Sequence, residues 1–220
     1  ACLVGSEMCI RDSMKGMCMP FVAVDVNGDR VDITKHPQPK TTIKRGSVFC
    51  PSCGKDFIIR EGSMKRSHFA HKIADDWCPY SVYERGQSAE HREAKIFISE
   101  NLKSYWPEYA SSECLIEYFI KTPNSRKNRI ADLLFKFNSG WDVVHEIQLS
   151  PQSEEVLKQR TEDYLLMGMD VVWWFGGKAL QQEHNIRWSQ ETYGGLFKVE
   201  FSRTDGIHEA RLPIGSRSRY

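Results

Sequence analysis

The sequence predicts a mixed α/β core domain over residues 81–178, preceded by a small β-rich unit over residues 47–80. Two observations predict the core. Its segments switch between helical spacing of apolar residues and short runs rich in β-branched and aromatic residues. Their order is one helix, three consecutive strands, a second helix and a last strand. We expect helices at 88–102 and 152–167 and strands at 114–120, 130–137, 141–149 and 170–175.

The ends of these elements carry local signals. Ser88 is a suitable N-cap for the first helix, and Glu90 places negative charge in its first turn. Gly168 follows the second helix at the C′ position, where glycine is favoured. The apolar run at 170–175 is expected to be a buried strand, because two consecutive glycines stop it.

The hairpin around residues 138–140 is the stretch on which the rest of the core is expected to be organised. These residues, Asn-Ser-Gly, suit a hairpin loop. A three-residue loop sets Asp132 directly opposite Glu146, and Gln148 projects from the same face. Two facing carboxylates are costly unless a cation or a proton lies between them. The hairpin therefore carries a candidate metal site, unless the pair is solvent-facing or the register slips by one residue.

The segments outside the core have simpler predictions. Residues 1–13 lack the basic start and the continuous apolar run of a signal peptide and resemble translated adaptor sequence, so we expect the native protein to begin at Met14. Residues 14–46 are expected to form a hairpin with a type I′ turn at Asn27-Gly28, followed by a linker. Residues 179–220 are expected to be a C-terminal extension with a short helix near residues 180–188 and a strand at 196–201.

Charge and cysteine content narrow the class of protein. The 220 residues have a net charge of +1, but residues 35–72 hold nine Lys or Arg against two acidic residues, a local charge of +7. This segment, with Lys65 and Arg66 near its end, predicts contact with nucleic acid. No apolar run approaches the roughly 20 residues of a membrane span. The seven cysteines fit a reducing cytoplasm better than a secreted disulfide framework.

A cysteine and histidine cluster predicts a zinc site within residues 47–80. Cys50 and Cys53 are separated by two residues, which lets both thiolates reach one tetrahedral ion. His68, His71 and Cys78 follow. We expect the first two cysteines, His71 and Cys78 to bind zinc, with His68 as the alternative ligand. A redox dithiol and ordinary surface histidines are the competing interpretations.

Both core helices place ionisable side chains beside apolar stripes. His91 and Lys95 share an apolar stripe of the first helix, and Glu90 lies on the adjacent one. Arg160 and Tyr164 share an apolar stripe of the second helix. An arginine there needs an anionic partner or a wet cavity. The alternative is that the Lys95 and Arg160 side chains extend along the surface, so that their charged ends reach water.

Together these features resemble the PD-(D/E)XK nuclease fold, and within it the CoiA-like competence proteins. The resemblance covers about residues 21–175 and keeps the order of that family's landmarks. The module before the core is then a zinc-ribbon-like module. The motifs are Cys50-x₂-Cys53, His68-Phe-Ala-His71, Glu90-His91 with Lys95, Ala131-Asp132, Glu146-Ile-Gln148-Leu-Ser150, Arg160 with Tyr164, and Val171-Val-Trp-Trp174.

The resemblance implies roles for the hairpin residues. Asp132 and Glu146 would hold Mg²⁺ or Mn²⁺, helped by a backbone carbonyl near Ile147. The metal would polarise the phosphate and lower the pKa of the attacking water. Ala131 stands where the family has a proline, which leaves the ligand set intact. Gln148 replaces the family's lysine, so it can orient a water but supplies no charge.

The resemblance also implies roles for the helices. Lys95 would take over the part of the missing lysine, and His91 or Glu90 would assist the metal. Arg160 would face a substrate phosphate. The expected function is a metal-dependent DNA nuclease of DNA uptake and recombination, acting on single-stranded or branched DNA with recombination or uptake proteins as partners. The alternative is a zinc-dependent DNA-binding module whose nuclease-like domain is inactive.

Overall fold

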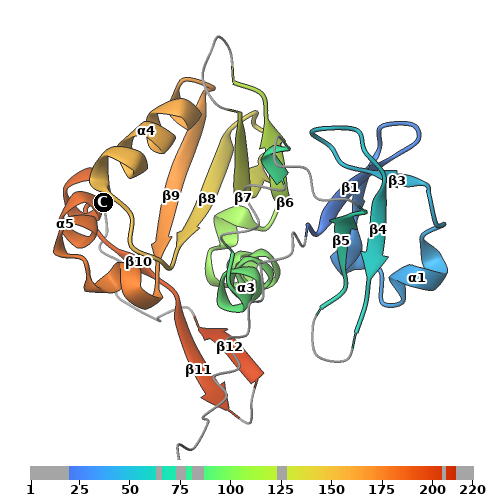
Figure 1. The fold of residues 1–220 in the computed structure, drawn as a ribbon. Helices are drawn as coiled ribbons and strands as arrows, with labels where there is room; N and C mark the ends of the chain where they lie inside the picture. The colour runs from blue at the N-terminus through green and yellow to red at the C-terminus, as the bar shows by residue number, and fades with distance from the viewer. Residues whose placement is uncertain are drawn as a thin grey trace, which may run out of the picture.

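The computed structural model describes residues 20–62, 66–72, 78–80, 87–122, 128–204 and 207–211, and from residue 202 onward only the backbone. Lys65 and the expected leader at 1–13 lie outside these residues. The described residues form an N-terminal unit of short strands, a larger core built on one sheet, and a strand pair that projects from the core (Figure 1).

The core is a five-stranded sheet. Along the chain, one helix precedes its strands and another lies between its third and fourth strands. Its elements are α3 (Ala89–Tyr105), η2 (Pro107–Tyr109), β6 (Glu113–Ile120), β7 (Arg129–Lys136), β8 (Asp142–Gln148), α4 (Glu154–Leu165), β9 (Met169–Phe175) and β10 (Phe197–Lys198). The strand order is β10-β9-β8-β7-β6. Strands β6 to β8 are an antiparallel meander, whereas β9 pairs parallel to β8 and to β10. The expected mixed α/β core is confirmed.

Helices cover both faces of this sheet. Because successive side chains of a strand point to opposite sides, each strand contributes to two cores. The core on the α3 side contains Ile98, Leu102, Leu133, Phe135, Ile147 and Trp174. The core on the α4 side contains Leu134, Val144, Leu157, Tyr164, Trp173 and Trp188. The meander is therefore buried on both faces, and any polar side chain in the middle of it must find a partner inside the protein.

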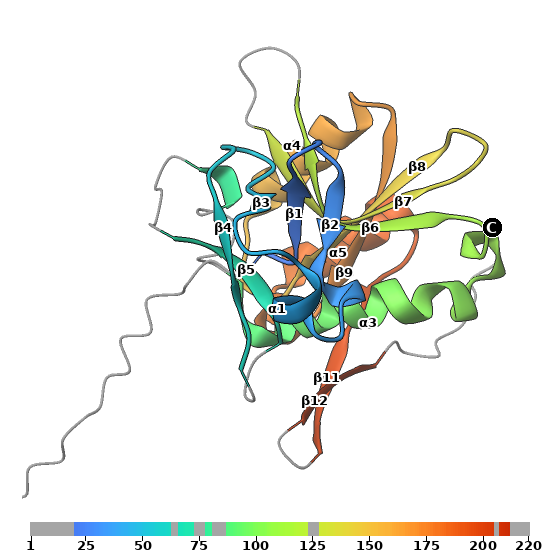
Figure 2. The same cartoon turned by 90° about the vertical axis from the view of Figure 1, so that its right-hand side faces the viewer.

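The N-terminal unit consists of two small sheets. Its elements are β1 (Val22–Asp25), β2 (Arg30–Asp32), η1 (Ile33–Lys35), α1 (Pro39–Thr42), β3 (Val48–Phe49), β4 (Phe57–Arg60) and β5 (His68–His71). One sheet has the order β2-β1-β3 and the other pairs β4 with β5. Strand β3 thus joins the zinc-type segment to the first hairpin. The segment expected as a linker contains α1, a single turn that begins at Pro39. Figure 2 shows this unit in front of the core.

The hairpin at Asn27-Gly28 forms, but its predicted turn type is wrong. A type I′ turn needs positive φ at both central residues, and of these two only Gly28 has it, at 86°. The Asp25 carboxylate accepts hydrogen bonds from the backbone N–H groups of Asn27 at 2.8 Å and Asp29 at 2.9 Å. This side-chain capture closes a longer loop and outcompetes the two-residue turn.

The C-terminal extension completes one edge of the core. After β9 come η3 (Gly177–Gln181) and α5 (Glu183–Tyr193), and after β10 come β11 (Glu200–Thr204) and β12 (Ile207–Arg211). The expected strand at 196–201 is split between the five-stranded sheet and the pair β11–β12, which lies below α3 (Figures 1 and 2). In the described part of the chain, none of the helices has the length and apolar character needed to cross a membrane.

His145 lies at the centre of an aromatic cluster on the α3 side of the sheet. Trp174 Nε1 donates a hydrogen bond to its Nδ1 at 2.9 Å, so the neutral ring carries its proton on Nε2. Nε2 lies 3.0 Å from the Tyr109 hydroxyl, which can accept that proton. Burial lowers the pKa of His145 to about 3. The folded protein therefore keeps His145 neutral at pH values where the unfolded chain is protonated.

This depressed pKa predicts acid sensitivity. Below pH 6.5 the unfolded state binds a proton at His145 and the folded state does not, so stability is lost as pH falls. The free energy of unfolding should drop by about 2 kcal/mol between pH 7 and pH 5 from this residue alone. Denaturant unfolding at both pH values measures it. The drop should shrink by that amount in His145→Phe, and an equal pH dependence in the two proteins would contradict the assignment.

Candidate active site and metal cluster

Strands β7 and β8 separate where the two predicted acidic residues lie. Their hydrogen-bonded ladder ends at the pair Leu133–His145, and the register is the one that the three-residue loop predicts. The next pair in that register is Asp132 opposite Glu146. Both residues are 1% exposed. Both acidic residues thus lie inside the protein, at the point where the two strands separate.

The strict alternation of side chains is interrupted at Asp132. Ile130 and Leu133 both pack on the α3 side, and Ala131 and Leu134 both pack on the α4 side. The residue across from Asp132 on β6 is Glu117, which has a positive φ of 53°. The backbone distortion shifts the phase of both strands by one residue. Asp132 therefore does not share the α4 face cleanly with Glu146, as simple alternation predicts, but lies in the gap between β7 and β8.

The contacts of Asp132 show this position directly. Its Oδ2 accepts a hydrogen bond from the backbone N–H of Ile147 at 2.9 Å and lies 2.9 Å from His91 Nε2. His91 is held in the first turn of α3, where the Ser88 side chain caps its backbone N–H at 3.2 Å. The predicted N-cap therefore fixes the histidine that reaches Asp132.

Glu146 faces the helix on the other side. Its Oε1 accepts hydrogen bonds from Arg160 Nη2 at 2.7 Å and from the Tyr164 hydroxyl. Burial raises the pKa of Glu146, Arg160 and Tyr164 oppose the shift, and the charge of Asp132 adds to it, with a net pKa of about 7. The negative charge of Asp132 is therefore one cause of the raised pKa of Glu146, although the two carboxylates bond to different helices.

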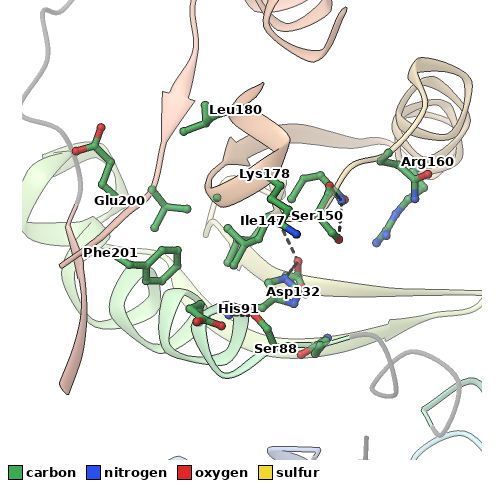
Figure 3. Close-up of a pocket in the computed structure, with 17 residues that line it drawn as sticks. Ser88, His91, Asp132, Ile147, Ser150, Arg160, Lys178, Leu180, Glu200 and Phe201 are labelled. Atoms are coloured by element: carbon green, nitrogen blue, oxygen red, sulfur yellow. Dashed lines mark hydrogen bonds and ion pairs between the residues drawn. The ribbon is translucent and has the colours of Figure 1, made fainter. Parts of the chain in front are cut away.

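An open cleft of about 1000 Å³ leads to this site (Figure 3). Five of the residues predicted from the sequence line it, namely Glu90, His91, Asp132, Gln148 and Arg160. Its other walls come from the C-terminal extension, including Lys178, Leu180, Glu200 and Phe201. The Gln148 side chain is neutral and donates a hydrogen bond to the Ser150 carbonyl at 2.6 Å. The structure thus brings α3, β7, β8, α4 and the extension to one cleft.

Lys95 is not among the residues that line the cleft, although it contacts Gln87, which is one of them. Its ammonium group forms a buried ion pair with Glu117 and contacts Gln87 Oε1 at 2.8 Å. Glu117 also accepts the backbone N–H of Phe21 at 2.8 Å, and the Tyr80 hydroxyl donates to the Glu117 carbonyl at 2.9 Å. Sequence reasoning missed Glu117, because a lone acidic residue in an apolar strand gives no sign of its partner.

The donor set at Asp132 and Glu146 suits Mg²⁺ or Mn²⁺. Among the described residues, the compact group of three or more potential ligands from Cys, His, Asp and Glu lies in the N-terminal unit and not here. Two carboxylates would leave several positions to backbone oxygen, water and substrate phosphate, which is how Mg²⁺ is usually held. A divalent cation would also offset the repulsion that contributes to the raised pKa of Glu146.

The compact group in the N-terminal unit is Cys50, Cys53, His71 and Cys78, whose ligand atoms all lie within 4.8 Å of one another. Cys50 Sγ is 3.5 Å from Cys78 Sγ, and Cys53 Sγ is 3.3 Å from His71 Nε2. Tetrahedral zinc with Zn–S bonds of about 2.3 Å separates two sulfurs by about 3.8 Å. Burial raises the pKa of the Cys50 thiol well above its usual range, and Cys78 raises it further. A cation would offset that cost, so the cluster could bind zinc.

The other residues predicted for the N-terminal unit are placed differently. His68 Nδ1 lies 2.9 Å from the Arg66 carbonyl, and His68 is not part of the group of four. Residues three apart on a strand face opposite sides, so β5 directs only one of its two histidines to the cysteines. The Arg66 guanidinium pairs with Glu93 on α3 at 2.9 Å but remains 54% exposed. Lys65 lies outside the described residues.

The fold, the cleft and the Cys/His cluster define a nuclease-like α/β domain joined to a small module whose Cys/His cluster could hold a metal ion. Residues 87–205 match the nuclease-like domain of competence protein CoiA, and residues 33–81 match the CoiA N-terminal domain. The chain belongs to the CoiA competence protein family. Competence protein CoiA of Bacillus subtilis (strain 168) is 25% identical over 162 residues, which is 73% of this chain but 39% of that relative.

Zinc content and ligand choice give the first test of the cluster. We expect purified protein to contain about one zinc per chain, and Cys53→Ser or His71→Ala to lose most of it, because a tetrahedral site needs all four ligands. Metal analysis after dialysis measures this. The matched controls are Cys114→Ser and His68→Gln, which lie outside the cluster and should retain zinc. Equal zinc loss in His68→Gln and His71→Ala would contradict the ligand set.

Proposed function

We propose that this chain is a metal-dependent deoxyribonuclease, a Mg²⁺- or Mn²⁺-dependent phosphodiesterase that acts in the cytoplasm in DNA uptake and recombination. The observation that carries the proposal is the pair of buried carboxylates, Asp132 and Glu146, at facing positions of adjacent strands, with Asp132 lining the open cleft. Two buried acids at one opening are costly to keep for packing alone. A cation that binds a phosphate explains why they are there.

The chain's own residues divide the work in this proposal. Asp132 and Glu146 would hold the ion, which supplies a polarised phosphate and a more acidic water when bound. His91 orients the Asp132 carboxylate through its 2.9 Å contact. Arg160 and Tyr164 hold Glu146 ready and favour its charged form. Gln148, at the rim of the cleft, can position a water but cannot act as a cation.

The N-terminal unit would hold a structural zinc and contribute to DNA binding. Its support is the Cys/His cluster together with the local charge of +7 in residues 35–72. Single-stranded or branched DNA is the proposed substrate, and uptake or recombination proteins are the proposed partners. Because the matched region covers 39% of the B. subtilis relative, these roles are proposed for this part of such a protein.

A DNA-binding module with an inactive nuclease-like domain is the second candidate. Two observations favour it. Gln148 is neutral where the resemblance calls for a lysine, and the Glu146 carboxylate is already bonded to Arg160 and Tyr164. Under this interpretation the protein binds DNA and the carboxylates shape the site without cleaving anything.

The cleavage activity of the Asp132→Asn variant distinguishes the active nuclease from the inactive DNA-binding module. The change keeps the shape of the side chain but removes a negative charge, so we expect cleavage with Mg²⁺ or Mn²⁺ to fall at least about 100-fold. Single-stranded, duplex and branched DNA should be assayed with each metal. The control is Asp142→Asn, at the opposite end of β8, which should cleave normally.

The same assay can reject either candidate. Wild-type protein that binds DNA but cleaves none of the three substrates with either metal would support the inactive module. Asp132→Asn that cleaves at the wild-type rate would show that the catalytic metal, if there is one, is not held by Asp132.

A further inference from the structure

We propose that Lys178 is the residue that places a positive charge on the substrate phosphate in the cleft. This inference rests on the proposed function and names a residue that the sequence motifs do not include. Lys178 lies on η3, in the C-terminal extension, and lines the same cleft as Asp132, Gln148 and Arg160. Figure 3 shows its side chain reaching into the cleft toward Asp132.

The charges that line the cleft single out this lysine. Arg160 is committed to Glu146 at 2.7 Å, and its guanidinium packs 5.7 Å from the Trp173 ring. His91 is committed to Asp132. Lys178 is the lining cation for which the described part of the chain shows no ion pair and no hydrogen bond. An ammonium group held at the rim without a protein anion is available to a phosphate oxygen.

The backbone fixes Lys178 beside the segment that carries Gln148. The Gly176 N–H donates to the Gln148 carbonyl at 3.0 Å, and the Ala179 N–H donates to the Leu149 carbonyl at 3.1 Å. Ala179 is fully buried. These two bonds bracket Lys178, so the turn that bears it cannot move independently of the end of β8.

Two glycines permit this close approach. A Cβ on Gly176 would lie 2.7 Å from the Val199 carbonyl oxygen and 2.7 Å from Leu149 Cδ2. Gly177 has φ of 51°, and a Cβ there would lie 3.0 Å from the Leu149 carbonyl oxygen. Any larger residue at either position would push the turn away from β8. The Gly-Gly pair that ends β9 is thus what brings the next residue, Lys178, to the cleft.

The chemistry explains why a lysine is useful at this place. Gln148 leaves the end of β8 neutral, whereas phosphodiester cleavage adds negative charge to the phosphate oxygens in the transition state. An ammonium on a flexible stem can meet those oxygens as a point charge without a fixed bidentate geometry. In this role Lys178 stabilises charge on the phosphate oxygens and is not the group that moves a proton.

Binding without cleavage tests the phosphate contact by itself. The probe is a short fluorescein-labelled single-stranded oligonucleotide in Ca²⁺, titrated with Lys178→Met, Lys178→Arg and wild type over a range of salt. Loss of one phosphate contact should lower the slope of log Kd against log salt by about 0.7 and weaken binding several-fold. Lys178→Arg should keep the wild-type slope. The control Lys136→Met, at the opposite end of β7 and β8, should bind like wild type.

Cleavage in Mg²⁺ or Mn²⁺ is the second measurement. With the contact in place, Lys178→Met should cleave about 100-fold more slowly than wild type, and Lys178→Arg should recover part of the rate. A wild-type slope together with a wild-type rate in Lys178→Met would overturn the inference. If wild type binds but does not cleave, a lowered slope in Lys178→Met still supports the contact while the proposed function fails. If wild type binds no oligonucleotide, both are rejected.

Discussion

The buried ion pair between Lys95 and Glu117 is the interaction on which the arrangement of this protein depends. Both side chains are 0% exposed, and the pair joins helix α3 to the edge strand β6. Glu117 also receives the backbone N–H of Phe21, and its carbonyl receives the Tyr80 hydroxyl, so the N-terminal unit is tied to the same residue. Breaking one partner of such a pair leaves an uncompensated buried charge and costs about 3–5 kcal/mol. Glu117 on β6 therefore bonds both to helix α3 and to the N-terminal unit.

This pair also frames the cleft. Lys95 lies one helical turn beyond His91 on α3, and Glu117 lies across from Asp132 on β6, where the backbone leaves the regular strand conformation. The two elements that the ion pair holds together are thus the ones that bring His91 and Asp132 within 2.9 Å. Tyr80 comes two residues after Cys78 of the Cys/His cluster. Tyr80, close to the cluster in the chain, thus bonds to Glu117, and Lys95 bonds both to Glu117 and to Gln87, which lines the cleft.

The order of the core elements and the pairing of Asp132 with Glu146 could be predicted, because loop length and apolar patterning act locally along the chain. The distortion opposite Asp132 could not, since it occurs at Glu117, whose bonding partners lie far away in the sequence. The same limit hid Lys178, which reaches the cleft only because β9 runs parallel to β8 and ends beside it. For β5 the alternation of a strand selects one histidine for the cysteines, but the sequence pattern did not reveal the strand. Local signals therefore predicted the framework, and the long-range contacts decided which charges meet.

The seating of the N-terminal unit on β6 changes how much of this sheet edge is open to another molecule. Strand β6 is an outer strand of the five-stranded sheet and runs for eight residues, and such an edge can recruit a strand from another molecule. Arg30 donates to the Ile116 carbonyl and Tyr80 to the Glu117 carbonyl, so the N-terminal unit occupies acceptors that a foreign strand would need. The opposite edge, β10, is only two residues long. The N-terminal unit thus blocks part of this edge from pairing with a strand of another molecule, and this effect depends on neither metal nor nucleic acid.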